Sequence, residues 1–179
     1  MGSSTVTVMT TEYLLNEQVE RVLQLLTPVN RRVCRTALHT GLRIGDVLSF
    51  KTDKIAAHFW IKEQKTGKKR IVGLTKELLE DLRAHAGKEW VFPGRSGKKP
   101  QTRQAVWADV KRAAKAIRLE ANAAPHSLRK CYAVDLMHRY GDIERVRRCL
   151  RHDRSTTTMI YAMADHLLRQ ESKKPRRRP

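Results

Sequence analysis

One pair of β-rich runs interrupts a chain that is otherwise patterned for helices. The runs 58-HFWIKEQ-64 and 69-KRIVGL-74 flank 65-KTGK-68, and this arrangement is typical of an antiparallel hairpin with an exposed basic tip. Apolar residues elsewhere recur with helical spacing. The fold class predicted is therefore mostly α with a small antiparallel β-hairpin, an α+β arrangement.

Capping signals predict where the helices begin and end. Thr27 followed by Pro28 is typical of a helix start, and Gly41 is typical of its end. A short helical stretch is expected over 43–50, and three or four helices between 125 and about 169. Caps are also predicted at Asn16 for a helix over 17–26, at Thr75 for one over 76–86, and at Thr102 for one ending near Ile117.

The domain organisation follows from the lack of internal repeats and of low-complexity linkers in the 179 residues. One folded domain is expected over 13–171, preceded by a flexible N-terminus over 1–12. The last residues, 172–179, are predicted to be a basic disordered tail.

The charge of the chain indicates what it binds. Lys and Arg number 37 against 18 Asp and Glu, which gives a formal charge of +19, and the tail supplies only five of the cations. A polyanionic partner is expected, with nucleic acid first and an acidic membrane surface second. No apolar run could span a membrane and no secretory signal is present, so a cytoplasmic protein is predicted. Cys34, Cys131 and Cys149 are interpreted as reduced thiols.

Two basic residues near turns are candidates for anion binding. Arg43 follows 40-TGL-42 at the start of a helix, where the helix dipole disfavours a cation, so an anion partner would explain it. The alternative is a surface arginine or one paired with Asp46, although Asp46 could equally orient Arg43 for function. Lys65 lies at the hairpin tip, where a lysine in a solvated turn is the simpler interpretation.

The C-terminal half adds two further pairs. His126 and Arg129 in 126-HSLRK-130 would share one face of the helix after Pro125 and could meet a phosphate; local packing of the histidine beside a solubilising arginine is the alternative. His152 precedes Tyr161 by nine residues. A lone tyrosine on such a helix is usually structural.

Taken together, these residues resemble the catalytic set of the tyrosine recombinases, the phage integrase family. The resemblance spans residues 14–168 and is carried by 40-TGLRIGD-46, 65-KTG-67, 126-HSLR-129, 150-LRH-152 and 157-TTMIY-161. Six positions agree in order: Arg43, Lys65, His126, Arg129, His152 and Tyr161. Arg151 and Gly73 depart from the glycine and proline usual in the family, and the family's histidine soon after the tyrosine is absent.

The resemblance implies the tyrosine recombinase catalytic domain fold and a division of labour among these residues. Tyr161 would attack a DNA phosphate and form a 3′-phosphotyrosine linkage. Arg43 and Arg129 would clamp the phosphate oxygens, because guanidinium groups match them in pairs and stay protonated. His152 would donate a further hydrogen bond, His126 would accept the proton of Tyr161, and Lys65 would protonate the leaving 5′ oxygen.

The same resemblance implies the partners and the reaction. Double-stranded DNA carrying a specific recombination site is the expected partner, bound by a homo-tetramer, with a monomer free in solution as an alternative. No cofactor, ATP or metal is implied, because cationic side chains supply the charge stabilisation.

Missing N-terminal DNA-binding domains indicate either a catalytic fragment or a small single-domain inversion recombinase. Rival interpretations are a type IB topoisomerase, a non-catalytic DNA-binding protein and, last, an RNA-binding protein.

Overall fold

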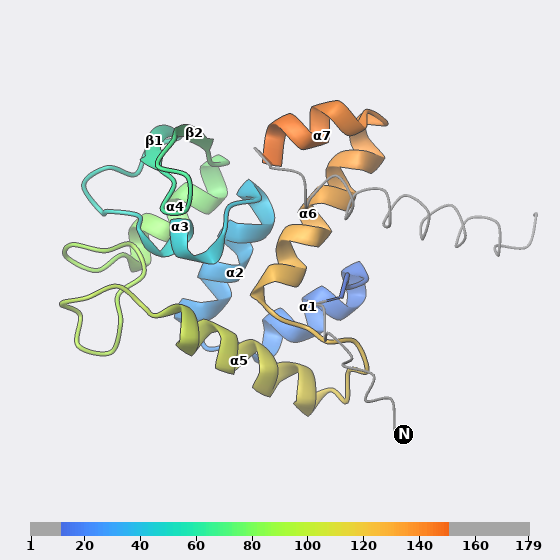
Figure 1. The fold of residues 1–179 in the computed structure, drawn as a ribbon. Coiled ribbons are helices and arrows are strands. Elements are labelled where there is room, and N and C mark those ends of the chain that lie inside the picture. Colours follow the sequence, from blue (N-terminus) through green and yellow to red (C-terminus); the bar gives the residue numbers. More distant parts are fainter. Residues whose placement is uncertain (1–11, 151–179) are drawn as a thin grey trace, which may run out of the picture. The chain divides into compact units, whose positions relative to one another are not determined.

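The structure, a computed structural model, describes residues 12–150 of the chain (Figure 1). The chain divides after Cys131 into two compact units, and each is described by itself. Among residues 12–150, no helix is both long enough and apolar enough to cross a membrane. The elements in chain order are α1 (Asn16–Leu25), α2 (Pro28–Thr40), α3 (Ile44–Leu48), β1 (His58–Lys62), β2 (Lys69–Gly73), α4 (Lys76–His85), α5 (Arg103–Ala116), α6 (Pro125–Tyr140) and α7 (Ile143–Leu150).

The predicted hairpin is present as β1 and β2, paired antiparallel with Phe59 opposite Val72. Phe59, Ile61 and Val72 are buried, whereas Trp60 and Ile71 form an exposed pair on the other face. This alternation places one face of the hairpin on the apolar core. The mostly helical fold with a small antiparallel β-hairpin is thereby confirmed.

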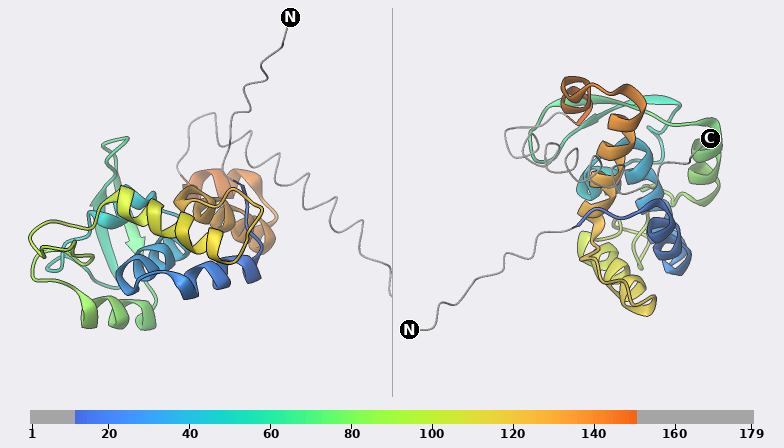
Figure 2. Two further views of the ribbon diagram at one scale, coloured as in Figure 1. Left: turned by 90° about the horizontal axis from the view of Figure 1, so that it is seen from below. Right: turned by 90° about the vertical axis from the view of Figure 1, so that its right-hand side faces the viewer.

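Helices α1, α2 and α5 pack against one another in the first unit, as the views in Figures 1 and 2 show. α2 starts at Pro28 and ends at Thr40, and its C-cap Gly41 has a φ of 65°, the left-handed conformation that glycine adopts at little cost. The turn at Gly41 leads through buried Leu42 into α3. This turn therefore places Arg43 at the start of α3 as its N-cap residue.

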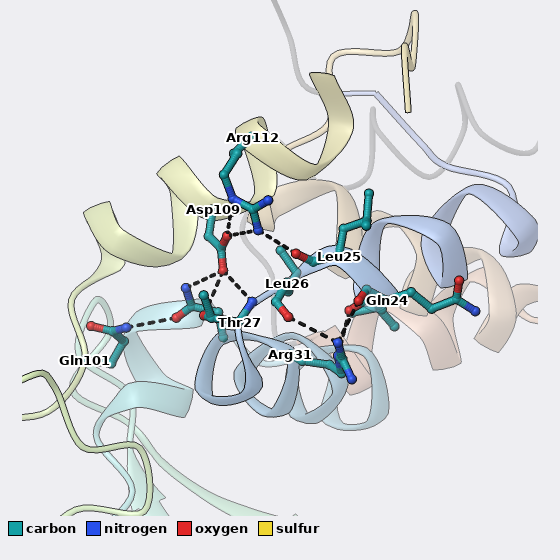
Figure 3. A network of polar contacts seen from close by, with 10 residues as sticks. Gln24, Leu25, Leu26, Thr27, Arg31, Gln101, Asp109 and Arg112 are labelled. Carbon is teal, nitrogen blue, oxygen red and sulfur yellow. Dashed lines mark hydrogen bonds and ion pairs between the residues drawn. The ribbon is translucent and has the colours of Figure 1, made fainter. Parts of the chain in front are cut away.

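A partly buried polar network joins the start of α2 to α5 (Figure 3). One carboxylate oxygen of Asp109 accepts hydrogen bonds from the Thr27 amide, the Thr27 hydroxyl and the Asn30 side chain, at 2.9, 2.9 and 2.8 Å. The other oxygen accepts from Arg112 at 2.6 Å. Asn30 in turn accepts from Gln101 at 3.0 Å. Asp109, on a different helix, thus satisfies the orphan backbone N–H of Thr27 at the start of α2.

The second unit is described over residues 132–150. The end of α6 is linked to α7 by Gly141, which has a φ of 62°. Asp142 follows and accepts hydrogen bonds from the backbone amides of Glu144 and Arg145, which caps the start of α7. A small apolar cluster holds the two helices together and comprises Ala133, Leu136, Val146 and Leu150.

Candidate active site

Three of the predicted site residues line a single pocket of about 800 Å³ in the first unit: Arg43, His126 and Arg129. Arg43 precedes α3 as its N-cap residue, and the other two lie in the first turns of α6. The remaining lining residues are Ile44, Gly45, Arg103, Gln104, Trp107, Ala108, Ala124 and Pro125. The lining contains three arginines and no carboxylate, so it suits an anion.

Arg129 is fixed in place before any ligand arrives. Its side chain is only 2% exposed, and its guanidinium donates a hydrogen bond to the carbonyl oxygen of Gly41. The last carbonyls of a helix lack partners within the helix, and the left-handed turn at Gly41 leaves this one available. The end of α2 therefore orients Arg129, and 24% of the side chain of Arg43 remains exposed at the pocket.

Burial and neighbouring cations lower the pKa values of two pocket residues, Arg129 and His126. Burial, followed by the charges of Arg43 and Arg70, lowers the pKa of Arg129 to about 10, against the opposite effect of Glu63 and Asp46. Arg129 stays protonated at neutral pH. Partial burial, followed by the charges of Lys130, Arg129 and Arg43, lowers the pKa of the His126 imidazole below 6.5. His126 is consequently neutral at pH 7 and can accept a proton.

Glu63 is a buried carboxylate that the sequence interpretation missed. It is 1% exposed, and its oxygens lie 3.7 Å from the guanidinium of Arg43 and 3.9 Å from that of Arg70. A signal was present, because Glu63 continues the alternation of the inward-facing residues Phe59 and Ile61. A charged residue at such a position requires a buried partner.

Asp46 contacts the hairpin, whereas the sequence suggested a contact with Arg43. It is buried, and one of its carboxylate oxygens accepts the backbone N–H of Gln64 at 2.8 Å. Within residues 12–150, the carboxylate found in ion-pair distance of Arg43 is that of Glu63. Asp46 thus ties the hairpin to α3, and its predicted support of Arg43 stays a prediction.

Lys65 is exposed on the loop between β1 and β2 and does not line the pocket. His152 and Tyr161 lie outside the described residues, so their predicted positions are not tested. Among residues 12–150, no three His, Cys, Asp or Glu side chains gather closely enough to hold a metal ion. The structure therefore unites three of the six predicted catalytic residues.

The similar proteins of known name are described as integrases or recombinases. The chain is 35% identical over 136 residues to a putative integrase/recombinase, y4qK, of Sinorhizobium fredii; the match covers 72% of this chain but only 44% of that protein. It is 29% identical over 158 residues to a probable integrase/recombinase, YoeC, of Bacillus subtilis, with 83% of this chain and 87% of that protein covered.

Solved structures share the fold. A lambda integrase tetramer bound to a Holliday junction superimposes with a TM-score of 0.71 at 21% identity, over 84% of this chain and 48% of that one. The profile of the phage integrase family matches residues 12–167. The chain therefore belongs to the phage integrase family.

Proposed function

We propose that residues 13–171 form the catalytic domain of a tyrosine recombinase, which breaks and rejoins DNA at specific sites through a covalent 3′-phosphotyrosine intermediate. The observation that carries the proposal is the convergence of Arg43, His126 and Arg129 on one pocket whose lining has no carboxylate. Family membership and the names of the relatives support it.

The two arginines would stabilise the transition state. Negative charge builds on the nonbridging oxygens as a phosphodiester is attacked, and donors that are already aimed at those oxygens lower the barrier. Arg129 is preorganised by its bond to Gly41, and Arg43 by its ion pair with Glu63. The pocket therefore offers two guanidinium groups that need little reorganisation when the phosphate enters.

The remaining residues would move protons and form the new bond. The phenol oxygen of Tyr161 attacks phosphorus while neutral His126 takes its proton. The P–O5′ bond breaks, and Lys65 gives its proton to the departing oxygen. His152 donates a hydrogen bond to the phosphate. Because Lys65 lies on an exposed loop outside the pocket, this step requires the loop to approach bound DNA.

The proposed partner is double-stranded DNA carrying a recombination site, in the cytoplasm where that DNA lies. The 3′-phosphotyrosine keeps the energy of the broken bond, so a 5′ hydroxyl of another strand can reseal it without ATP. Exchange between two duplexes needs several active sites at once. A homo-tetramer on DNA is proposed accordingly, and the tetrameric state of the similar lambda integrase structure supports it.

A nicked suicide substrate tests the function. The duplex carries the recombination site of the chain and a nick that lets the cleaved fragment diffuse away, so that the covalent protein–DNA adduct accumulates. We expect a denaturant-resistant adduct with the native chain and none with Tyr161→Phe. Arg43→Ala should slow adduct formation by about 100-fold or more, because one oxyanion donor is lost.

Tyr140→Phe is the matched control, because Tyr140 is an exposed tyrosine on α6 that does not line the pocket. Its adduct should form at the native rate. An undiminished adduct in Tyr161→Phe would refute the assignment of the nucleophile. An adduct that relaxes a supercoiled plasmid but never joins two DNA partners would replace recombination with topoisomerase activity.

A further inference from the structure

The carboxylate of Glu63 has three side-chain contacts, with Arg43, Arg70 and Thr66. Its carboxylate lies within ion-pair distance of Arg43 and Arg70, and one oxygen also accepts a hydrogen bond from the Thr66 hydroxyl at 2.7 Å. Burying a carboxylate costs free energy that ion pairs and hydrogen bonds must offset. A residue that stabilised only the hairpin could be apolar, as its inward-facing neighbours Phe59 and Ile61 are.

The contacts of Glu63 join the pocket to the loop of Lys65. Thr66 follows Lys65 directly, and the backbone of Glu63 closes the loop through hydrogen bonds with Gly67 and Lys68 at 2.8 and 3.0 Å. Gly67 adopts a φ of 67°, which permits this tight closure. Lys65 itself stays exposed. The loop is therefore anchored at its base and open at its tip.

The third contact ties the same carboxylate to the end of α2. Arg70 donates a hydrogen bond to the carbonyl oxygen of Thr40 at 2.9 Å, one residue before the carbonyl that holds Arg129. Arg43, Arg70 and Arg129 are like charges in one region, and Glu63 and Asp46 are the carboxylates that act on Arg129 there. Glu63 thus lies between the arginines of the pocket and the lysine loop.

We infer that Glu63 is a positioning residue that sets the Lys65 loop against Arg43, so that the clamp and the proton donor act on the same phosphate. The inference rests on the proposed function. It predicts a defect in the chemical step without a defect in DNA binding, because Glu63 does not line the pocket. It also predicts that part of the defect comes from the loss of proton donation by Lys65.

Two variants separate these contributions. Thr66→Val removes the hydroxyl that bonds Glu63 and leaves the ion pairs with the arginines in place. Glu63→Gln keeps the size of the side chain and removes its charge, which affects both Arg43 and the loop. Each should slow single-turnover adduct formation by about tenfold or more at saturating DNA, because general acid catalysis and charge stabilisation weaken. The DNA dissociation constant should change by less than about twofold, because neither substitution removes a residue that lines the pocket.

A substrate with sulfur in place of the bridging 5′ oxygen supplies the decisive readout. A thiolate leaves without needing a proton, so a defect that acts through Lys65 disappears on this substrate. Lys65→Ala is the positive control for such rescue. We expect the Thr66→Val rate to return to the native rate, and the Glu63→Gln rate to return only in part because Arg43 has lost its partner.

Thr52→Val is the matched control, because the Thr52 hydroxyl also ties two loops through Gly87 but contacts neither Glu63 nor the pocket. It should form adduct at the native rate on both substrates. Absence of sulfur rescue in Thr66→Val, or loss of DNA binding with an unchanged rate, would overturn the inference. Failure of the native chain to form an adduct on either substrate would instead refute the proposed function, and this inference with it.

Discussion

His126 is the residue whose protonation should limit the proposed reaction at low pH. Burial and the neighbouring cations hold the pKa of its imidazole below 6.5, so the ring is neutral through the neutral range and becomes charged only as the pH falls past that lowered value. A charged ring cannot accept the tyrosine proton. The rate of adduct formation should therefore stay level from pH 8 to pH 7 and fall in more acidic buffer by about tenfold per pH unit.

NMR titration of the His126 imidazole in the DNA-free chain tests whether this residue causes the loss of rate at acidic pH. The pKa should lie below 6.5, and it should rise when DNA binds, because a phosphate in the pocket offsets the charges of Lys130, Arg129 and Arg43. His126→Gln should form adduct slowly and without the acidic limb. A free-state pKa above 6.5 would contradict the described environment of the ring.

Single residues also show how far sequence reasoning reaches. Motif order identified Arg43, His126 and Arg129, and the structure places all three at one pocket. Glu63 was missed because the run around Lys65 was interpreted as a solvated basic tip. The carbonyl partner of Arg129 could not be predicted either, because Gly41 lies 88 residues away in the sequence and no local pattern encodes so distant a contact.

At the scale of elements, the start of α2 depends on Asp109 in α5. Asp109→Ala should destabilise the fold by about 2 kcal/mol, because the buried amide of Asn30 and the partly buried amide of Thr27 lose their acceptor. Urea unfolding measures this change. Asp135→Asn is the control: Asp135 forms an exposed pair with Arg139, and such pairs contribute at most about 1 kcal/mol.

The contribution of Asp109 should also depend on pH. Burial alone raises the pKa of this carboxyl, but hydrogen bonds from Asn30, Thr27 and Arg112 outweigh burial and bring the pKa below 3.8. A carboxyl with a lowered pKa in the folded state stabilises that state above the unfolded pKa of about 3.9. The stability difference between the native chain and Asp109→Asn should shrink as the pH falls below about 4. A constant difference down to pH 2 would contradict this account.

Helix ends were predicted unevenly, for a physical reason. Thr75 and Thr102 accept hydrogen bonds from the amides of Leu78 and Ala105, as expected of N-caps. The prediction for Asn16 was wrong: α1 begins at Asn16, Leu15 is the N-cap, and the Gln18 side chain accepts the Leu15 N–H at 2.9 Å. The side chain of Leu15 has no oxygen that could accept a helix N–H, so the Ser, Thr, Asn or Asp that usually marks an N-cap was absent at this position.

At the scale of the whole molecule, the sequence predicted one catalytic domain over 13–171. The boundaries of this domain stay predictions. The family profile matches residues 12–167, close to that span. Within the described residues the chain divides after Cys131, inside α6, where no proline, glycine or linker marks a boundary. A continuous helix hides such a division from sequence analysis, because helical periodicity runs through it unchanged.

The net charge of the whole molecule should govern its affinity for DNA. Each phosphate neutralised releases counterions, so the logarithm of the binding constant falls against the logarithm of salt concentration with a slope of about −0.9 per phosphate contact. Deleting residues 172–179 removes five cations and leaves a formal charge of +14. If the folded body makes most contacts, titration of a fluorescent duplex should show a slope that stays steep, weakened by less than half. A slope that collapses towards zero in the shortened chain would assign DNA affinity to the tail, and the arginine pocket would then need another explanation.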